Sequence, residues 1–366
     1  MKIGVLGAGQ LGRMLALAGC RLGYRFRFFD TSSDAPAAQL GELHTGSWQD
    51  VQALRRFADG LDVITYEFEN VSLFAAKTCS DCAPVWPPLG ALEMGQDRVK
   101  EKACFRKLDI PSAVFREAHN FEELKQATLD LGFPCVIKTT TLGYDGKGQY
   151  VLRNQNDAEA AWRALAGSGV IVEQFIAFER EISVIAVRSM AGDIAFYPIA
   201  QNEHQQGILR TSRVPTVNLS ESLQAKAQDY ARRILEEYRY VGVMAIELFE
   251  TKGELLANET APRVHNTGHW SIDGAITSQF ENHLRAITGL ALGSTDLRCP
   301  TVMHNLLGEP PAMEALAAIP GAAIHLYGKS PRPGRKIGHI NLLGSSVEEL
   351  AEREKILNAL VVKSSS

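Results

Sequence analysis

The sequence predicts an α/β protein, and two observations support this prediction. Apolar, strand-like segments alternate with helix-like segments through the first part of the chain, which is typical of a doubly wound sheet. Residues 181–189 and 194–203 then alternate apolar and polar side chains, as antiparallel strands do. A chain of 366 residues is long enough for two or three domains.

The N-terminal unit begins with a strand over residues 3–7, which a glycine-rich turn joins to a helix over residues 10–22. A second strand covers residues 25–29, and residues 61–70 predict a later strand with a loop at its end. The proline-rich segment 83–92 indicates a boundary, because proline and glycine interrupt regular structure.

The remaining elements follow from the same periodicities. Helices are expected over residues 97–110, 121–132, 156–165 and 221–240. Strands are expected over residues 133–138, 149–153, 169–176, 242–250 and 254–260. From about residue 295 the sequence predicts a small mixed unit.

Composition excludes several classes of protein. The formal net charge of −4 is small, so no overall field favours DNA or RNA. The chain enters its first strand directly and has no apolar run of the ~20 residues that a membrane helix needs, so a soluble, cytoplasmic protein is expected. The six cysteines are scattered, and the Cys79-x-x-Cys82 pair lacks the second pair or the context of a zinc or redox site.

The first glycine turn, Gly7-x-Gly9-x-x-Gly12, has the spacing of a dinucleotide-binding turn. Glycines let the backbone approach an anion, and the N-terminus of a helix supplies unpaired N–H donors. Asp30, at the end of the second strand, stands where a ribose-binding acid would. The same residues would serve another phosphate ligand, or a tight turn that needs glycine for packing alone, so the motif by itself leaves the ligand open.

A second glycine-rich loop, residues 139–148, joins two strands of a hairpin. Lys138 ends the first strand, and the amides of Gly143, Gly146 and Gly148 could close over phosphate oxygens beside Lys147. The loop matches neither a Walker A motif nor the kinase motifs. An ordinary hairpin with a flexible tip is the alternative.

Two carboxylates are expected to face each other in the hairpin of residues 242–260. A tight turn at Lys252-Gly253 places Glu247 opposite Asn258 or Glu259, depending on the register. Opposed carboxylates repel, and a divalent cation removes that repulsion. Oxygen-only ligands suit Mg²⁺, although glutamates on a solvated sheet face are the alternative.

The segment "TAPRVHNTGHW" follows the hairpin at once. Arg263, His265, Asn266 and His269 favour a pocket for a small oxyanion. The two histidines are four residues apart, but the segment is rich in Gly and Asn and is not expected to be helical, so the zinc-binding geometry of a helix is missing.

A basic loop over residues 327–340 lies near the C-terminus. It carries Lys329, Arg332, Arg335 and Lys336 among prolines and glycines. Four cations on a stiff loop could bind a phosphate, although a solvated basic loop is the alternative.

The order of these pieces resembles that of the ATP-grasp carboxylate–amine ligases. Within that superfamily, "GAGQLGRML", "LGYDGKGQ", "NEHQQGILRTS", "NETAPRVHNTGHW" and "RPGRKIGHIN" are similar to the N5-carboxyaminoimidazole ribonucleotide synthetases of purine synthesis. The resemblance implies an ATP-grasp fold with a Rossmann-like pre-ATP-grasp domain over 1–95, a lid over 96–170, a catalytic domain over 171–294 and a mixed C-terminal subdomain over 295–366.

The resemblance also implies a reaction. MgATP would phosphorylate bicarbonate, and the carboxyphosphate would release CO₂ that carboxylates the amine of 5-aminoimidazole ribonucleotide. ATP and Mg²⁺ are implied as cofactors, without biotin or NAD, and so is a homodimer. Another ATP-grasp ligase, such as the formate-dependent glycinamide ribonucleotide transformylase, is the alternative function.

Residue roles follow from the resemblance. ATP would be bound by Arg98, Lys138, Gly143, Tyr144, Asp145, Gly146, Lys147, Gly148, Gln149, Glu173, Gln174, Phe175, Ile176, Glu181, His204, Asn258 and Glu259. Glu247 and Glu259 would hold Mg²⁺, while Arg263, His265 and Asn266 would bind bicarbonate. Tyr144 and Asp145 would contact the aminoimidazole. The ribonucleotide would also meet Gln10, Leu11, Glu67, Lys329, Arg332, Arg335 and Lys336, so the first glycine turn would face this substrate instead of NAD.

Overall fold

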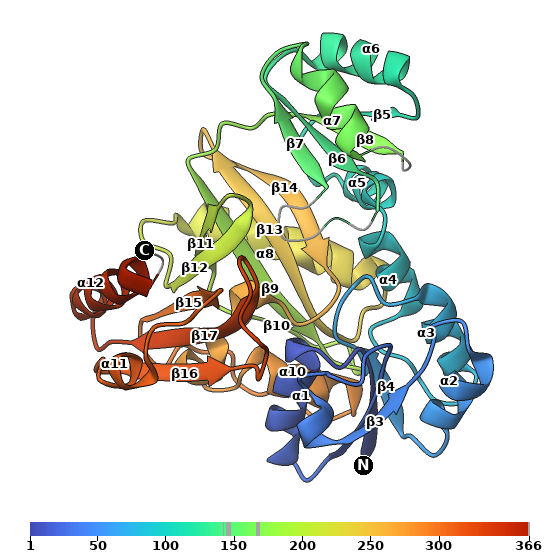
Figure 1. Cartoon of the computed structure of the whole chain (residues 1–366), viewed down its shortest axis with the longest axis vertical. Helices are drawn as coiled ribbons and strands as arrows, with labels where there is room; N and C mark the ends of the chain where they lie inside the picture. The colour runs from blue at the N-terminus through green and yellow to red at the C-terminus, as the bar shows by residue number, and fades with distance from the viewer. Residues whose placement is uncertain (142, 144–147, 166–168, 365–366) are drawn as a thin grey trace.

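The computed structural model of the chain describes residues 1–141, 143, 148–165 and 169–364. Three β-sheets organise these residues, and Figure 1 shows the N-terminal unit and a separate small sheet on either side of the long central strands. No helix of the described residues is long and apolar enough to cross a membrane.

The N-terminal unit is a parallel sheet in the order β3-β2-β1-β4. Its strands are β1 (Lys2–Leu6), β2 (Arg25–Asp30), β3 (Glu42–Thr45) and β4 (Val63–Tyr66). Its helices are α1 (Gln10–Cys20), η1 (Ala38–Leu40), α2 (Val51–Ala58), α3 (Leu73–Ser80) and α4 (Leu89–Gly95). Helix α4 was not predicted, because the proline-rich segment 83–92 indicated a boundary, whereas Pro87 and Pro88 precede this helix and do not interrupt it.

Helix α5 (Arg98–Lys107) leads into a four-stranded antiparallel sheet in the order β5-β8-β6-β7. Its strands are β5 (Phe115–Ala118), β6 (Cys135–Thr139), β7 (Gln149–Leu152) and β8 (Val170–Gln174). Helices α6 (Phe121–Leu131) and α7 (Asp157–Leu165) cover one face of this sheet around a separate small core. Gly132 ends α6 with a φ of 74°, as its position after the periodic segment predicts.

The largest sheet is antiparallel and runs in the order β14-β13-β9-β11-β12-β15-β17-β16, with β10 also paired to β9. Its strands are β9 (Arg180–Arg188), β10 (Ile194–Phe196), β11 (Ala200–Gln205), β12 (Ile208–Val214), β13 (Gly242–Thr251), β14 (Glu254–Ala261), β15 (Thr301–Leu307), β16 (Ala322–Leu326) and β17 (Lys336–Leu343). The single strand expected over residues 194–203 is wrong: it divides into β10 and β11 around Pro198, which has no N–H for a ladder hydrogen bond.

Helices pack on the large sheet and join it to the N-terminal unit. They are α8 (Glu221–Glu237), η2 (Asn266–Gly268), α9 (Ser271–Gly274), α10 (Gln279–Ile287), α11 (Met313–Ala317) and α12 (Val347–Ser364). Helix α10 contacts both α1 and β13. The buried His283 of α10 accepts the Val243 N–H at Nδ1 (3.1 Å), so its Nε2–H is free to donate to Thr65 Oγ1 of β4 (2.9 Å). This histidine therefore links the parallel sheet to the large sheet.

Candidate active site

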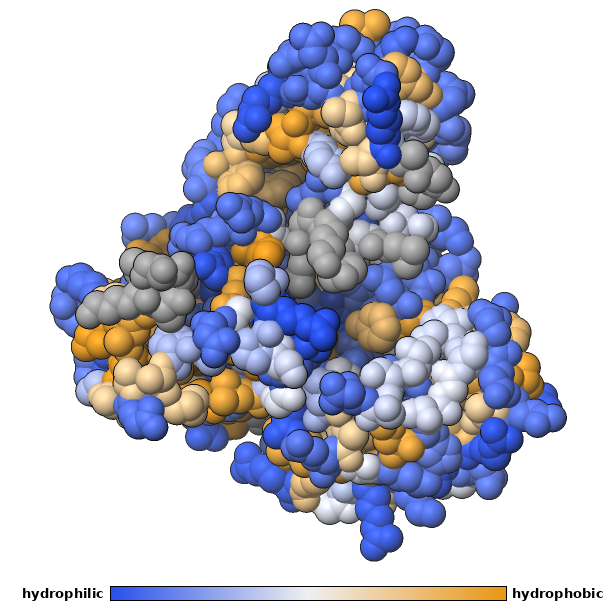
Figure 2. All heavy atoms as spheres, viewed as in Figure 1, coloured by the Kyte–Doolittle hydropathy of each residue, from blue (hydrophilic) through white to orange (hydrophobic). Residues whose placement is uncertain are grey.

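A cleft of about 750 Å³ is lined by residues of the small antiparallel sheet, of the large sheet, and of α1 and the loop after β4 in the N-terminal unit. Hydrophilic side chains gather around the hollow in the middle of the face seen in Figure 2. The expected site residues at its wall are Gln10, Leu11, Arg98, Lys138, Gly143, Gln149, Glu173, Gln174, Phe175, Ile176, Glu181, His204, Glu247, Asn258, Glu259, Arg263, His265, Asn266 and Lys336. Tyr144, Asp145, Gly146 and Lys147 lie outside the described residues.

The register of the β13–β14 hairpin places Glu247 directly opposite Glu259. Lys252 and Gly253 have φ values of 51° and 73°, which fit the tight hairpin turn that the sequence predicts. A bulge next to Glu247 leaves Asn258 as the extra residue of β14, so it is not the partner of Glu247. Of the two registers that the sequence left open, the structure therefore has the one that opposes the carboxylates.

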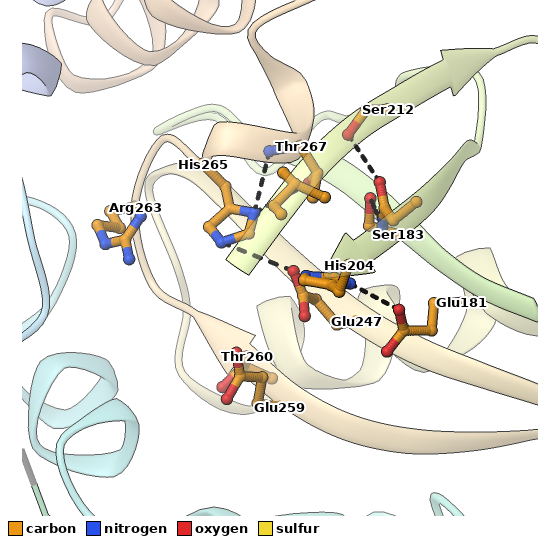
Figure 3. A network of polar contacts seen from close by, with 12 residues as sticks. Glu181, Ser183, His204, Ser212, Glu247, Glu259, Thr260, Arg263, His265 and Thr267 are labelled. Carbon is orange, nitrogen blue, oxygen red and sulfur yellow. Dashed lines mark hydrogen bonds and ion pairs between the residues drawn. The ribbon is translucent and has the colours of Figure 1, made fainter. Parts of the chain in front are cut away.

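Burial and the neighbouring charge of Glu259 raise the pKa of Glu247 to about 8, although His204 partly opposes this rise. His265 Nε2 lies 3.8 Å from Glu247 Oε1 (Figure 3). Within the described part of the chain, no three His, Cys, Asp or Glu side chains gather as metal ligands. The two opposed carboxylates are the candidate cation ligands, because Mg²⁺ takes one or two protein carboxylates where phosphates supply its other ligands.

Buried ion pairs connect the small antiparallel sheet to this hairpin. Lys138 Nζ lies 2.6 Å from Glu173 Oε2, and Lys102 Nζ lies 2.9 Å from Glu173 Oε1. The two lysines also reach Asn258, Lys102 at the backbone oxygen (3.1 Å) and Lys138 at the side-chain oxygen (3.4 Å). Burial opposes ionisation of Glu173, but the charges of Lys138 and Lys102 outweigh it and lower its pKa to about 2. Sequence reasoning missed Lys102, because nothing in its helix indicates that this lysine is buried.

Arg98 lies at the start of α5, where the Asp97 side chain caps the helix. Its Nη2 is 3.9 Å from Glu259 Oε2, and a Cβ on Gly143 would come within 2.8 Å of its guanidinium. This arrangement places one cation between Gly143 and Glu259 of the carboxylate pair.

Glu181 and His204 form a hydrogen-bonded pair (2.6 Å) on neighbouring strands. Burial alone would lower the pKa of His204, but its bond to Glu181 and the charge of Glu247 raise it. Nearby, the Phe178 and Phe249 rings stack at 4.7 Å on the wall of the cleft beside Phe175. These two aromatic residues were not predicted as part of the site.

The segment after β14 brings Arg263, His265 and Asn266 to the cleft, as predicted. It contains a single 3₁₀ turn, η2, where no helical structure was expected. Burial and then the charge of Arg263 lower the pKa of His265 well below its usual value, so the ring is neutral. Its Nδ1 lies near both the hydroxyl (2.9 Å) and the N–H (3.4 Å) of Thr267. Because Nδ1 accepts the Thr267 N–H, Nε2 carries the proton and faces Glu247.

The Asn266 side chain differs from its neighbours. Its amide nitrogen and oxygen are both buried, and neither has a hydrogen-bond partner among the described residues. Arg263 forms an ion pair with Glu69, which extends from the loop after β4 and also lines the cleft. Sequence reasoning missed Glu69, although its spacing from Glu67 after an apolar strand was a usable signal.

The first glycine turn is occupied by the protein itself. Gly9 N–H donates to Glu67 Oε1 (2.5 Å), Gly12 N–H donates to Glu67 Oε2 (2.7 Å), and Ala8 N–H donates to Asp30 (2.9 Å). A Cβ on Gly9 would come within 2.6 Å of the Glu67 carboxylate, so close packing explains the glycine. The backbone N–H groups that a dinucleotide phosphate would need are thus already bonded to the carboxylates of Glu67 and Asp30. Glu67 is not part of the cleft wall.

The basic loop reaches this turn. Lys329 Nζ donates to Gln10 Oε1, and Lys336 lines the cleft. Arg335 is half-buried and donates to the Ser330 oxygen (3.1 Å), whereas Arg332 is exposed. Of the four cations, Lys336 therefore lines the cleft, and Lys329 contacts a residue of its wall. The roles of all four stay predictions.

Comparison with known proteins identifies the relatives of this chain. Family models match as "ribonucleotide synthetase preATP-grasp domain" over residues 1–96, "ATP-grasp domain" over 103–280 and "phosphoribosylaminoimidazole carboxylase C-terminal domain" over 301–353. The N5-carboxyaminoimidazole ribonucleotide synthase of Pseudomonas aeruginosa is 45% identical over 99% of both chains. These matches confirm the predicted α/β ATP-grasp fold with its preATP-grasp domain.

Solved structures agree. The N5-carboxyaminoimidazole ribonucleotide synthetase of Thermus thermophilus has a TM-score of 0.93 and 49% identity over 98% of both chains. The synthase of Aspergillus clavatus, solved with ADP and 5-aminoimidazole ribonucleotide, has a TM-score of 0.92 and 32% identity over 99% of this chain and 98% of that one.

Proposed function

Because this chain belongs to the N5-carboxyaminoimidazole ribonucleotide synthase family, we propose that it is an ATP-grasp ligase of purine biosynthesis that carboxylates 5-aminoimidazole ribonucleotide. ATP transfers its γ-phosphoryl group to a bicarbonate oxygen and leaves as ADP. The carboxyphosphate breaks into CO₂ and phosphate, and the amine forms an N–C bond to CO₂ with loss of one proton.

The observation that best supports this function is the buried amide of Asn266, which has no hydrogen-bond partner among the described residues and lies beside Arg263 and the neutral His265. A buried amide without partners is costly, so a polar ligand is expected there. Bicarbonate offers both an O–H donor and oxygen acceptors, which match the two ends of the amide. Formate has no such donor, so this residue favours bicarbonate over the formate-dependent alternative.

The oxyanion is bound by charge and by neutral donors together. Arg263 supplies a fixed positive charge, and His265 presents Nε2–H as a neutral donor. Donors that are already oriented before charge develops lower the barrier of a transfer step. Glu69 orients Arg263 through their ion pair.

The nucleotide end of the cleft is proposed to lie between the small antiparallel sheet and the large sheet. Arg98 and Lys138 contact its phosphates, and Gly143 and Gln149 line the same part of the cleft. The wall made by residues 173–176, together with Phe178 and Phe249, holds the adenine. Glu181 binds the ribose, with His204 beside it.

Glu247 and Glu259, with Asn258 beside them, fit Mg²⁺. The two carboxylates face each other, and burial together with the charge of Glu259 raises the pKa of Glu247. When bound, Mg²⁺ supplies charge neutralisation between the phosphates and these carboxylates.

The ribonucleotide is proposed to lie at the opposite end, near Gln10, Leu11 and the basic loop. Lys329 and Lys336 are the cations nearest the cleft for its phosphate. The expected homodimer and the four proposed domain ranges are retained as proposals, and light scattering of the purified chain tests the first.

The test is ADP release with MgATP, with bicarbonate and 5-aminoimidazole ribonucleotide each present or omitted. Release that requires both supports the proposal. Asn266→Leu should raise the KM for bicarbonate while the KM for ATP stays unchanged. Release that instead requires formate and glycinamide ribonucleotide would establish the alternative function.

A further inference from the structure

Gln279 is the first residue of α10, is fully buried, and does not line the cleft. Both ends of its side-chain amide bind one residue of the oxyanion segment. The His265 N–H donates to Gln279 Oε1 (2.9 Å), and Gln279 Nε2 donates to the His265 oxygen (2.6 Å). The side chain thus replaces the neighbouring strand that would otherwise pair with this backbone.

Further contacts hold the same segment to the helix. Ser271 Oγ donates to the Gly268 oxygen (2.6 Å) and accepts the Gln279 N–H (3.0 Å). A Cβ on Gly268 would come within 2.6 Å of Gln279 Oε1, so the backbone of η2 lies directly against the amide. Gln279 Nε2 is also 3.4 Å from His269 Nδ1.

We propose that Gln279 is a positioning residue that fixes His265 and Asn266 relative to the Glu247–Glu259 pair. The inference deepens the proposed function and rests on it. Since a displacement of about 1 Å can cost a hundredfold in rate, loss of this amide should impair bicarbonate binding and the capture of CO₂ by the amine. ATP would then be hydrolysed without carboxylation.

Gln279→Met is the principal variant, because Met has similar length and no hydrogen-bonding amide. Gln279→Glu keeps the acceptor for the His265 N–H but loses the donor to its oxygen. The readouts are the KM for bicarbonate, the KM for ATP, and the ADP formed per molecule of carboxylated product. The expected result is a KM for bicarbonate raised at least about tenfold, with excess ADP and an unchanged KM for ATP.

Asn282→Leu is the matched control. Asn282 is a fully buried amide of the same helix, but it donates to Tyr197 (2.8 Å) and the Gly293 oxygen (3.1 Å), away from the oxyanion segment. It should lower the melting temperature as Gln279→Met does, without changing the KM for bicarbonate or the ADP ratio. An equal change in both variants would overturn the proposal, because loss of a buried amide alone would then explain it.

Ser271→Ala serves if neither Gln279 variant folds, since it removes the neighbouring link with little change in volume. It should raise the KM for bicarbonate in the same direction, by about threefold. Wild-type values in every variant that folds would overturn the role of Gln279. If the wild-type protein shows no dependence on bicarbonate, the proposed function itself fails and this inference falls with it, and that outcome is seen before any variant is measured.

Discussion

Replacing Lys102 with methionine should destabilise the protein more than most surface changes do. Lys102 is 2% exposed, and its ammonium group contacts the buried Glu173 carboxylate and the Asn258 backbone oxygen. The variant keeps the length of the side chain but leaves Glu173 with Lys138 as its remaining ion-pair partner. The expected result is a lower free energy of unfolding.

The size of this decrease in the free energy of unfolding can be worked out from the lowered pKa of Glu173. Its pKa falls from 4.5 to about 2, which corresponds to ~3 kcal/mol in favour of the ionised form. Breaking a buried ion pair costs ~3–5 kcal/mol, and Lys138 at 2.6 Å retains part of the stabilisation. The free energy of unfolding should therefore fall by ~2–3 kcal/mol.

Urea unfolding at neutral pH, followed by circular dichroism, measures this change. Lys100→Met is the matched control on the same helix, since Lys100 pairs with Glu93 at the surface and should matter little. Equal urea midpoints for Lys102→Met and the wild type would refute the reasoning, because the buried charges would then contribute nothing to stability.

Three other predictions concern single positions. Burial opposes ionisation of Glu354, but its hydrogen bonds to His304 and Arg213 and their charges outweigh burial and lower its pKa to about 2. This carboxylate therefore stabilises the fold above pH ~4.5 and loses its effect as the pH falls toward 2. Glu354→Gln should make the melting temperature depend less on pH in this acid range, and an unchanged pH profile would contradict this. Glu259→Ala should lower kcat by orders of magnitude with the fold intact by circular dichroism, and normal turnover would exclude it as a metal ligand. Lys252→Asn should raise the free energy of unfolding by ~0.5 kcal/mol, since asparagine tolerates a φ of 51° better than lysine, and a decrease measured in urea would show that strain at this turn is not relieved.

Local sequence determined much of the fold, because its signals act between near neighbours. The alternation of residues 242–260 around Lys252-Gly253 indicated the hairpin and the face that carries Glu247. Gly132 likewise marked the end of α6. Pro198 shows the limit of such signals. The alternation of apolar and polar residues continues through Pro198, but the ladder of backbone hydrogen bonds is interrupted there because proline has no N–H.

For the site, the sequence supplied the residue types and, through the family resemblance, their expected roles. Only the tertiary structure decided which of them meet. The bulge that sets Glu247 against Glu259, the Glu67 carboxylate in the first glycine turn, and the amide of Gln279 on His265 were not predicted. The Glu67–Gly9 and Gln279–His265 contacts join residues that are far apart along the chain or on different elements. The identity of a side chain determines which hydrogen bonds it can form, but the packing of the chain determines which partner lies within reach.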